Sequence, residues 1–342
     1  MLELIRKAAR RLKLTEALWN MRRRGGSRLY HPASNLLLRA RTRKARGLNE
    51  KIRYKMARDR RPLLTVFADK LETKEYVKRA VGPEHVPVTL AEANSAGKLP
   101  WSSLPEEFAA KVNHGSGACV ISWQGAEAGS QVPEPTLANA WARAVVRPSA
   151  ANPEAIGAFL DLHLGLSYAW MFGELAYRDV RPRTFAEEYL PGEAGEAPVD
   201  YRMYCFGGRC EVVMVISLNI GNPDPTGARY LTDFFDRNWV HLDGSRDDTA
   251  PHDPTPARPD DLDQMIAIAN ELSAETDFLR VDLIRSEGRI LVSELTNFPN
   301  AGLIPATPES FERWLGDLWT LPRDYSTLPQ GAYPLPPVEP TT

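Results

Sequence analysis

Cysteine is scarce in this 342-residue sequence, which has only Cys119, Cys205 and Cys210. Three cysteines fit no disulfide framework, and no further zinc ligands stand near them, so we expect them to be buried and reduced. No apolar run approaches the roughly 18–20 residues that span a bilayer, and charge interrupts the N-terminus every few residues. These absences predict a cytoplasmic protein without a signal peptide.

Acidic residues are scarce in the first 61 positions, where 4 Asp/Glu accompany 20 Lys/Arg, although the whole chain has a net charge of only −2. Apolar residues recur there at roughly helical spacing: Leu4, Ile5, Ala8, Leu12, Leu18 and Met21. The pattern predicts a basic helical arm over residues 1–61, suited to an anionic membrane surface or polymer, or to the protein's own acidic remainder. No aromatic-interleaved or zinc-finger pattern supports nucleic acid as its partner.

The rest of the sequence predicts an α/β (α+β) protein with mixed, largely antiparallel sheets. Helices are expected in three places: about 14 residues that end at Gly82 and follow a turn, about 137–178 with breaks around Pro148 and Pro153, and from Asp260 onward. Strands are expected in these ranges: 85–90, two within 104–123, 183–190, the hairpin 200–219 and the hairpin 278–297. The remainder is expected to be loop at 123–136, a polar segment at 219–260 and a Pro-rich tail at 321–342.

The hairpin at 278–297 carries the most informative polar residues. Residues i and i+2 of a strand share a face, so Arg280 and Asp282 project together, and Glu294 can lie opposite Asp282. Two carboxylates with an oxygen or amide ligand just beyond suit a Mg²⁺ ion that carries nucleotide phosphates, and Arg280 can hold a phosphate oxygen. A solvated hairpin with scattered charges is the alternative.

Four other stretches become informative beside this hairpin. They are Asp69-Lys70 at a helix start, Lys111 with the turn Gly115-Ser116-Gly117, "AEEYL" at 186–190, and Asp200-Tyr201-Arg202. The glycine turn alone suits either an ordinary hairpin or a flap whose N–H groups hold phosphate.

In order and spacing, these motifs resemble the ATP-grasp superfamily, and in particular its teichuronopeptide-biosynthesis (TupA-like) branch. The branch resemblance rests on "LNEKI" (48–52), "PLLTVFADKLETKEYV" (62–77), "LPEEFAAKVNHGSG" (104–117), "GELAYRDVRPRTFAEEYL" (173–190), "DYRMYCFGG" (200–208), "FLRVDLI" (278–284) and "ELTNFP" (294–299). It runs from about residue 48 to about 318 and implies an ATP-grasp fold, in which two α+β lobes grip ATP between antiparallel sheets. The implied divisions are the arm 1–61, a pre-grasp segment 62–105, an ATP-grasp domain 106–320 (small lobe about 106–190, large lobe about 191–320) and the tail 321–342.

The resemblance implies ATP and Mg²⁺ as cofactors and a nucleotide role for several residues. Lys111 and the earlier Lys70 resemble the lysines that reach the phosphates, and the glycine turn looks like the phosphate-covering flap. His114 in that turn either donates to a phosphate or braces the turn. The implied nucleotide-binding set is Lys70, Lys111, His114, Gly115, Ser116, Gly117, a hinge at Glu187, Glu188, Tyr189 and Leu190 that reads adenine, and Asp200 at the ribose.

In the large lobe, the resemblance implies both metal and catalytic residues. Asp282 and Glu294 resemble the magnesium ligands, and Arg280 resembles the arginine that faces the transferred phosphoryl group. Arg202 is similar to the arginine on the phosphate or substrate side. Together with Lys111, the two arginines form the expected catalytic set.

The sequence departs from the superfamily pattern at the third metal ligand. This ligand is usually an asparagine two residues after the glutamate, and Thr296 occupies that position here. Asn297 follows, but strand alternation points it to the other face. Either Thr296 supplies an oxygen or a bulge brings Asn297 round.

The implied activity is ATP-dependent carboxylate–amine ligation through an acyl phosphate. The branch suggests an amino acid or peptide joined to a cell-surface polysaccharide or its precursor. The basic arm suits such an acceptor and would allow a peripheral position at the inner face of the membrane. A phosphotransferase on the same fold and a non-catalytic nucleotide-binding component of polysaccharide assembly are the alternatives. The aromatic residues of 219–260 either line the acceptor side or pack in a core: Tyr230, Phe234, Phe235 and Trp239, near Arg229.

Overall fold

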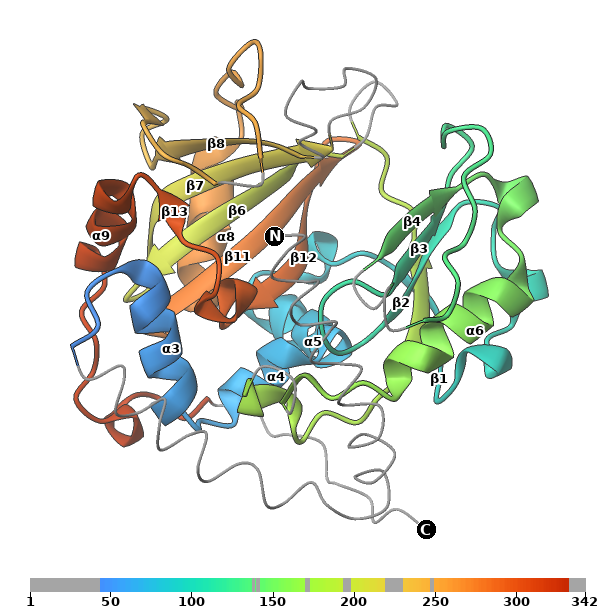
Figure 1. Cartoon of the computed structure of the whole chain (residues 1–342), viewed down its shortest axis with the longest axis horizontal. Coiled ribbons are helices and arrows are strands. Elements are labelled where there is room, and N and C mark those ends of the chain that lie inside the picture. Colours follow the sequence, from blue (N-terminus) through green and yellow to red (C-terminus); the bar gives the residue numbers. More distant parts are fainter. Residues whose placement is uncertain are drawn as a thin grey trace. The chain divides into compact units, whose positions relative to one another are not determined.

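A computed structural model of the chain describes residues 44–136, 139, 142–169, 173–192, 198–218, 230–246 and 249–331. The helix expected between Leu4 and Met21 lies outside the described residues, as does Arg229. The chain forms two compact units, and we describe each by itself (Figure 1). The described part of unit 1 is Val88–Glu174 and Arg181–Tyr189, and that of unit 2 comes from Thr42–Pro87, Leu175–Val180 and the chain from Leu190 onward.

Unit 1 is built on a mixed sheet of five strands in the order β1-β5-β2-β3-β4. The strands are β1 Thr89–Ala93, β2 Phe108–Val112, β3 Cys119–Ser122, β4 Arg143–Val146 and β5 Thr184–Glu188. Only β3 and β4 pair in parallel. Helix α6 (Pro153–Leu164) starts at Asn152, whose side chain accepts hydrogen bonds from Glu154 N and Ala155 N, and it buries Phe159 and Leu160 against one sheet face. The short 3₁₀ helices are η2 Ala96–Lys98, η3 Trp101–Ser103 and η5 Pro148–Ala150.

Unit 2 is built on an antiparallel sheet of six strands in the order β12-β11-β6-β7-β8-β9. The strands of this sheet are β6 Asp200–Phe206, β7 Arg209–Leu218, β8 Tyr230–Asp236, β9 His241–Leu242, β11 Phe278–Ser286 and β12 Arg289–Thr296. A separate two-stranded sheet consists of β10 Ser245–Arg246 and β13 Ala306–Thr307. The α-helices are α3 Leu48–Arg58, α4 Leu63–Ala68, α5 Lys70–Ala80, α8 Leu262–Ser273 and α9 Glu309–Asp317. The 3₁₀ helices are η1 Pro83–His85, η6 Leu175–Tyr177, η8 Pro299–Gly302 and η9 Tyr325–Thr327.

The core of unit 2 lies between α8 and one face of its sheet. The apolar positions of α8 recur at helical spacing and are all buried: Leu262, Met265, Ile266, Ala269 and Leu272. They pack with inward residues of the central strands, including Met203, Val213 and Val281. The expected helix after Asp260 and the expected hairpins at 200–219 and 278–297 are confirmed, as are the α+β class and the free, buried cysteines.

Several expected elements differ from those observed. The helix expected to end at Gly82 is confirmed as α5, where the Asp69 carboxylate accepts from Leu71 N and Glu72 N. The turn expected before it is instead the short helix α4, which ends at the extended backbone of Asp69. The helical zone at 137–178 was wrong in part, because β4 lies within it and pairs with β3. The strand expected at 85–90 begins later, at Thr89, after Pro87. The polar segment 219–260 contains β8, β9 and β10.

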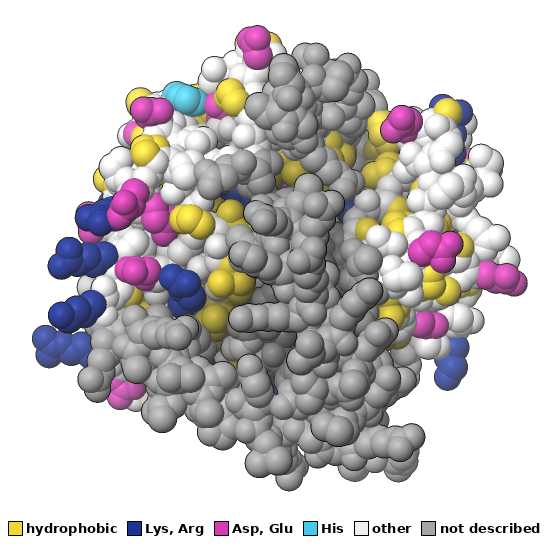
Figure 2. All heavy atoms as spheres, in the orientation of Figure 1, with side chains coloured by type: hydrophobic (Ala, Val, Ile, Leu, Met, Phe, Trp, Pro, Cys, Tyr) yellow, Lys and Arg dark blue, Asp and Glu magenta, His cyan; other side chains and the backbone are white. Residues whose placement is uncertain are grey.

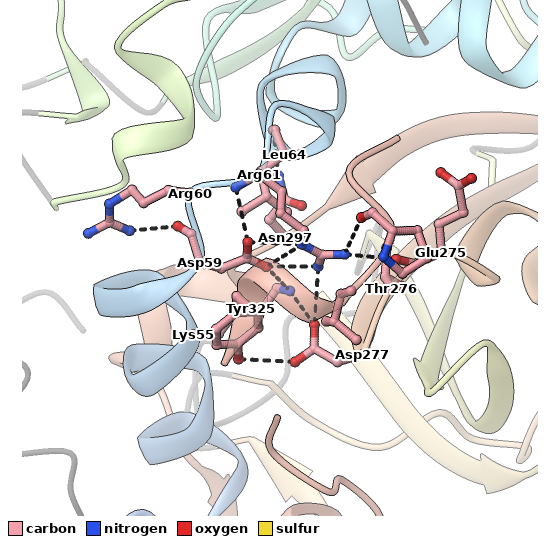
Figure 3. A network of polar contacts seen from close by, with 12 residues as sticks. Lys55, Asp59, Arg60, Arg61, Leu64, Glu275, Thr276, Asp277, Asn297 and Tyr325 are labelled. Atoms are coloured by element: carbon pink, nitrogen blue, oxygen red, sulfur yellow. Dashed lines mark hydrogen bonds and ion pairs between the residues drawn. The ribbon is translucent and has the colours of Figure 1, made fainter. Parts of the chain in front are cut away.

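A buried network of charges connects α3 to the sheet of unit 2 (Figure 3). Lys55, fully buried, lies 2.7 Å from Asp59 Oδ2 and pairs with Asp277. Arg61 binds the same Asp59 carboxylate through Nη2, at 2.8 Å. Burial disfavours the charge of Asp59, but Lys55 and Arg61 outweigh it and hold the pKa of Asp59 below its usual value.

The same network also holds the C-terminal segment. Tyr325 Oη donates to Asp277 Oδ2 at 3.1 Å, and Trp319 Nε1 donates to the same oxygen at 3.0 Å. Arg61 Nη1 donates to the carbonyl of Pro329 at 3.1 Å. Residues 44–61, which the sequence assigned to an arm, and residues 321–329 of the expected tail are thus packed parts of unit 2.

A second polar cluster fastens the loop after β10 to the sheet. Asp233 is buried and accepts from His241 Nε2 at 2.8 Å and from His252 Nδ1 at 2.7 Å. Because the carboxylate can only accept, His252 carries a proton on Nδ1, and its Nε2 lies 2.9 Å from Ser217 Oγ. Asp233 pairs in register with Val215, which belongs to the α8 core, so the cluster lies on the α8 side of the sheet.

Removing the buried ammonium of Lys55 should destabilise unit 2 strongly. Lys55→Met leaves two carboxylates buried beside Arg61 alone, and we expect a loss of about 3–5 kcal/mol in the free energy of unfolding. The matched control is Lys78→Met, because Lys78 makes an exposed pair with Glu75 at 2.6 Å, which is worth about 1 kcal/mol or less. Urea unfolding measures both, and equal small losses would contradict the role of the network.

The Asp233 cluster should give a pH-dependent contribution to stability. Burial acts to raise the pKa of Asp233, but hydrogen bonds from His252 and His241 outweigh it and lower that pKa. A carboxylate whose pKa is lower in the folded state than in the unfolded state stabilises the fold at a pH above the unfolded-state pKa of about 3.9. This stabilisation is lost as the pH falls through the folded-state pKa. Asp233→Asn should therefore cost about 1–3 kcal/mol at pH 7. The difference from wild type, followed by urea unfolding, should shrink below about pH 4, and a difference that stays constant would refute this account.

Candidate functional site

The hairpin of β11 and β12 places four polar side chains on one face of the unit 2 sheet. Asp282 lies opposite Glu294 in register, and Arg280 lies opposite Thr296. Residues two apart on a strand share a face, so all four project together. Val281, on the opposite face, belongs to the core under α8. The expected geometry of this hairpin is confirmed.

Arg280 and Asp282 form a two-point ion pair. Arg280 Nε lies 2.7 Å from Asp282 Oδ1, and Nη2 lies 2.6 Å from Oδ2. The residues are only 5% and 3% exposed, so the pair is shielded from water. Arg280 Nη2 also donates to Thr296 Oγ1 at 3.1 Å. These bonds fix the plane of the guanidinium group.

The electrostatics keep Arg280 charged. Burial acts to lower the pKa of Arg280, but the carboxylate of Asp282 outweighs it and raises that pKa. Burial raises the pKa of Asp282, and Arg280 and Arg202 oppose that shift. The arrangement therefore offers a fixed cation to an anionic group that lies against this face.

Each carboxylate of this face has a cation nearby. Arg202 Nε lies 3.7 Å from Asp282 Oδ2, and its Nη2 lies 3.3 Å from Asp200 Oδ2. Lys70 Nζ lies 3.8 Å from Glu294 Oε1. Lys70, from the start of α5, and Arg202, from β6, thus lie with the β11–β12 residues as the motifs predicted.

The two candidates for the third metal ligand point in different directions. Thr296 Oγ1 faces Arg280, on the side of the carboxylates. Asn297 is buried and donates from Nδ2 to the carbonyl of Leu64 on α4, at 2.9 Å (Figure 3). The register of the β11–β12 pairing shifts just after Asp282. This shift does not bring Asn297 to the face of the carboxylates. Thr296 is the residue that shares the carboxylate face.

The oxygen donors of this face fit a magnesium ion. Glu294 has a side chain that is 32% exposed, and its cation is farther away than a hydrogen bond would allow. Two carboxylates and a hydroxyl are hard oxygen donors, and Mg²⁺ usually takes one or two carboxylates with water and phosphate oxygens in its other positions. Within the part of the chain that the structure describes, no three His, Cys, Asp or Glu side chains form a metal group. A site here would therefore take its remaining ligands from phosphate and water.

In unit 1, Lys111 and Glu187 form an ion pair across β2 and β5. Glu187 is buried and lies opposite Ala109, two residues before Lys111, so both charges are on one sheet face. Burial acts to lower the pKa of Lys111, but Glu187 outweighs it and raises that pKa. The expected phosphate lysine is therefore held by the expected hinge glutamate.

An apolar patch surrounds this pair on the face that α6 does not cover. Its members are Ala109, Cys119 and Ile121, with Trp123, Val145 and Tyr189 packed against them. The rings of Trp123 and Tyr189 stack with centroids 5.8 Å apart. Burial raises the pKa of Tyr189 to about 12. An apolar patch with stacked aromatic rings beside a charged pair suits a planar heteroaromatic base.

The rest of the expected hinge lies in two units. Glu188 Oε1 accepts from Val88 N at 2.9 Å in unit 1. Leu190 begins the next part of unit 2, where it packs with Ile284 and Leu291. The side chain of Glu188 thus holds the main chain at the start of unit 1.

The turn between β2 and β3 is well anchored. Gly115 and Gly117 have φ values of +75° and +80°, which glycine adopts at little cost. His114 is buried, and its Nε2 donates to the carbonyl of Leu166 at 3.2 Å. This contact agrees with the alternative in which His114 braces the turn.

The motifs did not identify every residue of these surfaces. Ala109 and Ile121 are small and apolar, and only their alternation with Lys111 along the strands places them on the charged face. Tyr168, which contacts the glycine turn, lies 52 residues from Ser116. No local spacing predicts that contact.

The comparisons with known proteins agree with the motifs. The family described as TupA-like ATPgrasp matches residues 160–320, which carry the Arg280–Asp282 hairpin. That region of the chain belongs to the TupA-like ATP-grasp family. No curated protein matches the chain. Among the described residues, no helix has the length and apolar composition to cross a bilayer.

Solved structures of ATP-grasp enzymes resemble the chain distantly. D-alanine–D-alanine ligase from Bacillus anthracis is 14% identical over 69% of this chain and 59% of its own, with a TM-score of 0.36. The ATP-grasp ligase PsnB with a precursor variant, Mg and ADP is 12% identical over 75% and 60%, and D-cycloserine synthetase DcsG is 13% identical over 75% and 70%, both with a TM-score of 0.36. The chain thus spans less than two thirds of the first two proteins. At these scores the likenesses carry no argument about activity.

The two-point geometry of Arg280 predicts that lysine cannot replace it. Arg280→Lys keeps the charge but leaves one Asp282 oxygen and Thr296 Oγ1 without their donors, so we expect a loss of about 1–3 kcal/mol in the free energy of unfolding. Arg285→Lys on the same strand is the control, because Arg285 Nε meets Asp261 Oδ2 at 3.0 Å in a partly exposed pair. The control should lose about 1 kcal/mol or less. Urea unfolding of both variants measures the difference. Equal losses in the free energy of unfolding would be incompatible with a special role for the two-point ion pair of Arg280.

Proposed function

We propose that the chain is an ATP-dependent carboxylate–amine ligase that works through an acyl phosphate. The observation that carries the proposal is the Arg280–Asp282 pair, buried on β11 with Glu294 in register opposite it, inside the region that matches the family. A buried, oriented guanidinium beside oxygen donors suits transfer of a phosphoryl group.

Each unit has its own task in this proposal. In unit 2, Arg280 faces the transferred phosphoryl group, and Asp282, Glu294 and Thr296 would hold Mg²⁺. The ion would neutralise charge on the phosphates. Arg202, two residues from Asp200 on the same strand face, orients the phosphate or the donor carboxylate.

In unit 1, the apolar patch with Tyr189 receives an adenine ring and Lys111 meets a phosphate group. Lys111 exchanges Glu187 for a phosphate oxygen, which keeps the partly exposed ammonium paired before and after binding. The Gly115–Gly117 turn supplies main-chain N–H groups to phosphate and helps to keep water from the acyl phosphate.

The chemistry has two steps. A substrate carboxylate oxygen attacks the γ-phosphorus of ATP, and ADP leaves. The amine nitrogen then attacks the acyl carbon, phosphate leaves, and the nitrogen loses a proton. No nucleophilic side chain is required, since both bonds form between substrates.

The acceptor in this proposal is a cell-surface polysaccharide or its precursor, and an amino acid or peptide is attached to it. The TupA-like family and the excess of basic residues in 1–61 support this choice. Figure 2 also shows Lys and Arg side chains along one edge of unit 2, with Asp and Glu side chains near some of them. Positive surface favours an anionic polymer or a lipid-linked precursor at a membrane.

Loss of a metal carboxylate should abolish turnover without unfolding the chain. Glu294→Gln should lower ADP release in the presence of ATP, Mg²⁺ and substrates by roughly 100-fold or more, since metal stabilisation is worth several kcal/mol. Glu287→Gln, at the exposed turn of the same hairpin, is the control and should keep wild-type turnover. Chelation of Mg²⁺ should stop ADP release by the wild type.

The product distinguishes the ligase from a kinase on the same fold. Mass analysis after incubation with ATP, amino acids and uronic acids should show an amide together with ADP. A stable phosphoester instead of an amide would favour a phosphotransferase. Turnover by Glu294→Gln equal to that of Glu287→Gln would remove the metal assignment.

A further inference from the structure

Tyr168 makes a close contact with the glycine turn of unit 1. Its hydroxyl donates to the main-chain carbonyl of Ser116. A Cβ atom added to Gly115 would lie 2.2 Å from Cε2 and 2.6 Å from Cδ2 of Tyr168, so the ring packs directly on the main chain of Gly115. Tyr168 is buried, and it follows α6 by only four residues.

The segment 166–168 therefore holds the turn at three points. These are the bond from His114 to the carbonyl of Leu166, the ring of Tyr168 on Gly115, and the Tyr168 hydroxyl on Ser116. The turn itself has left-handed backbone at Gly115 and Gly117, and it adopts the same region at Ala118, with φ +48°. Left-handed conformation costs about 1–2 kcal/mol at a residue with a side chain, so outside contacts help to maintain it.

The hydroxyl bond also sets the direction of one N–H group. The carbonyl of Ser116 and the N–H of Gly117 belong to one planar trans peptide, in which the two point in opposite directions. Because Tyr168 binds the carbonyl, the N–H of Gly117 is directed to the side of the peptide away from Tyr168. A fixed main-chain donor in a left-handed turn is the kind of group that binds phosphate.

We propose that Tyr168 is a positioning residue for the phosphates of ATP, acting through the Ser116–Gly117 peptide. The proposal rests on the proposed function. The ring holds the turn in place, whereas the hydroxyl aims the Gly117 N–H at a phosphate oxygen. Removing the hydroxyl alone should impair ATP use more than it impairs folding.

The test compares two Tyr→Phe variants that remove equivalent bonds. Tyr168→Phe removes the bond to the Ser116 carbonyl, and Tyr76→Phe removes a bond from Tyr76 Oη to the carbonyl of Leu272, 3.3 Å long, in unit 2. Both should lower the melting temperature by similar small amounts. We expect KM for ATP to rise about tenfold in Tyr168→Phe, the size of one well-placed hydrogen bond, and to stay at the wild-type value in Tyr76→Phe.

A second variant keeps the test independent of the hydroxyl deletion. Gly115→Ala introduces a methyl group where the ring of Tyr168 lies, so the ring must move although its hydroxyl remains. Its KM for ATP should also rise about tenfold or more, and the double variant with Tyr168→Phe should be no worse than Gly115→Ala alone, because both changes disturb one contact.

The failure of the proposed function and the failure of the role of Tyr168 give different results. A wild-type protein that does not bind ATP in calorimetry would overturn the proposed function and this inference together. ATP binding by the wild type, with an unchanged KM in Tyr168→Phe or the same rise in Tyr76→Phe, would overturn the role of Tyr168 alone. Fully additive effects in the double variant would likewise refute it.

Discussion

The burial of Arg280 with Asp282 is the constraint on which the rest of unit 2 depends. Either charge alone would be costly in this environment, so the two must stay together, side by side on β11. Their strand is central, paired on one side with β6 and on the other with β12. A slip of one residue in either pairing would turn the pair into the α8 core. The charges therefore oppose register slips of the sheet as well as forming its polar face.

Charge pairing recurs wherever the proposed nucleotide contacts occur. Lys111 is paired with Glu187 in unit 1, and Lys70 lies near Glu294 in unit 2. Such pairs keep cationic side chains in place before an anionic ligand arrives. The anionic group of the ligand then takes the place of the carboxylate. This preorganisation limits the rearrangement needed when phosphate binds. The buried network around Lys55 has the same chemistry but connects α3 and the C-terminal segment to the sheet.

The sequence alone predicts the parts of the fold that depend on local periodicity. The alternation in 278–297 and the helical spacing after Asp260 predicted β11, β12 and α8, and with them the register of Asp282 and Glu294. For the third metal ligand, the same alternation left Thr296 and Asn297 both open, because a bulge could have turned Asn297 to the carboxylate face. Sequence analysis did not predict elements and contacts that depend on the pairing of distant segments of the chain. Strand β4 exists because it pairs with β3, and the contact of Tyr168 with Ser116 spans 52 residues. The basic residues Lys55 and Arg61 were assigned to an arm whose partner was left open, because Asp277, with which they pair, lies more than 200 residues away.

The central claim is that the polar face of β11 and β12 holds divalent metal and nucleotide phosphate. It is tested most directly by a crystal structure with Mn²⁺ and a non-hydrolysable ATP analogue, using the anomalous signal of the metal. The account predicts a metal peak at about 2.0–2.3 Å from a carboxylate oxygen of Glu294 or Asp282, with phosphate oxygens as further ligands. A nucleotide bound with its phosphates and metal away from these carboxylates would contradict the account.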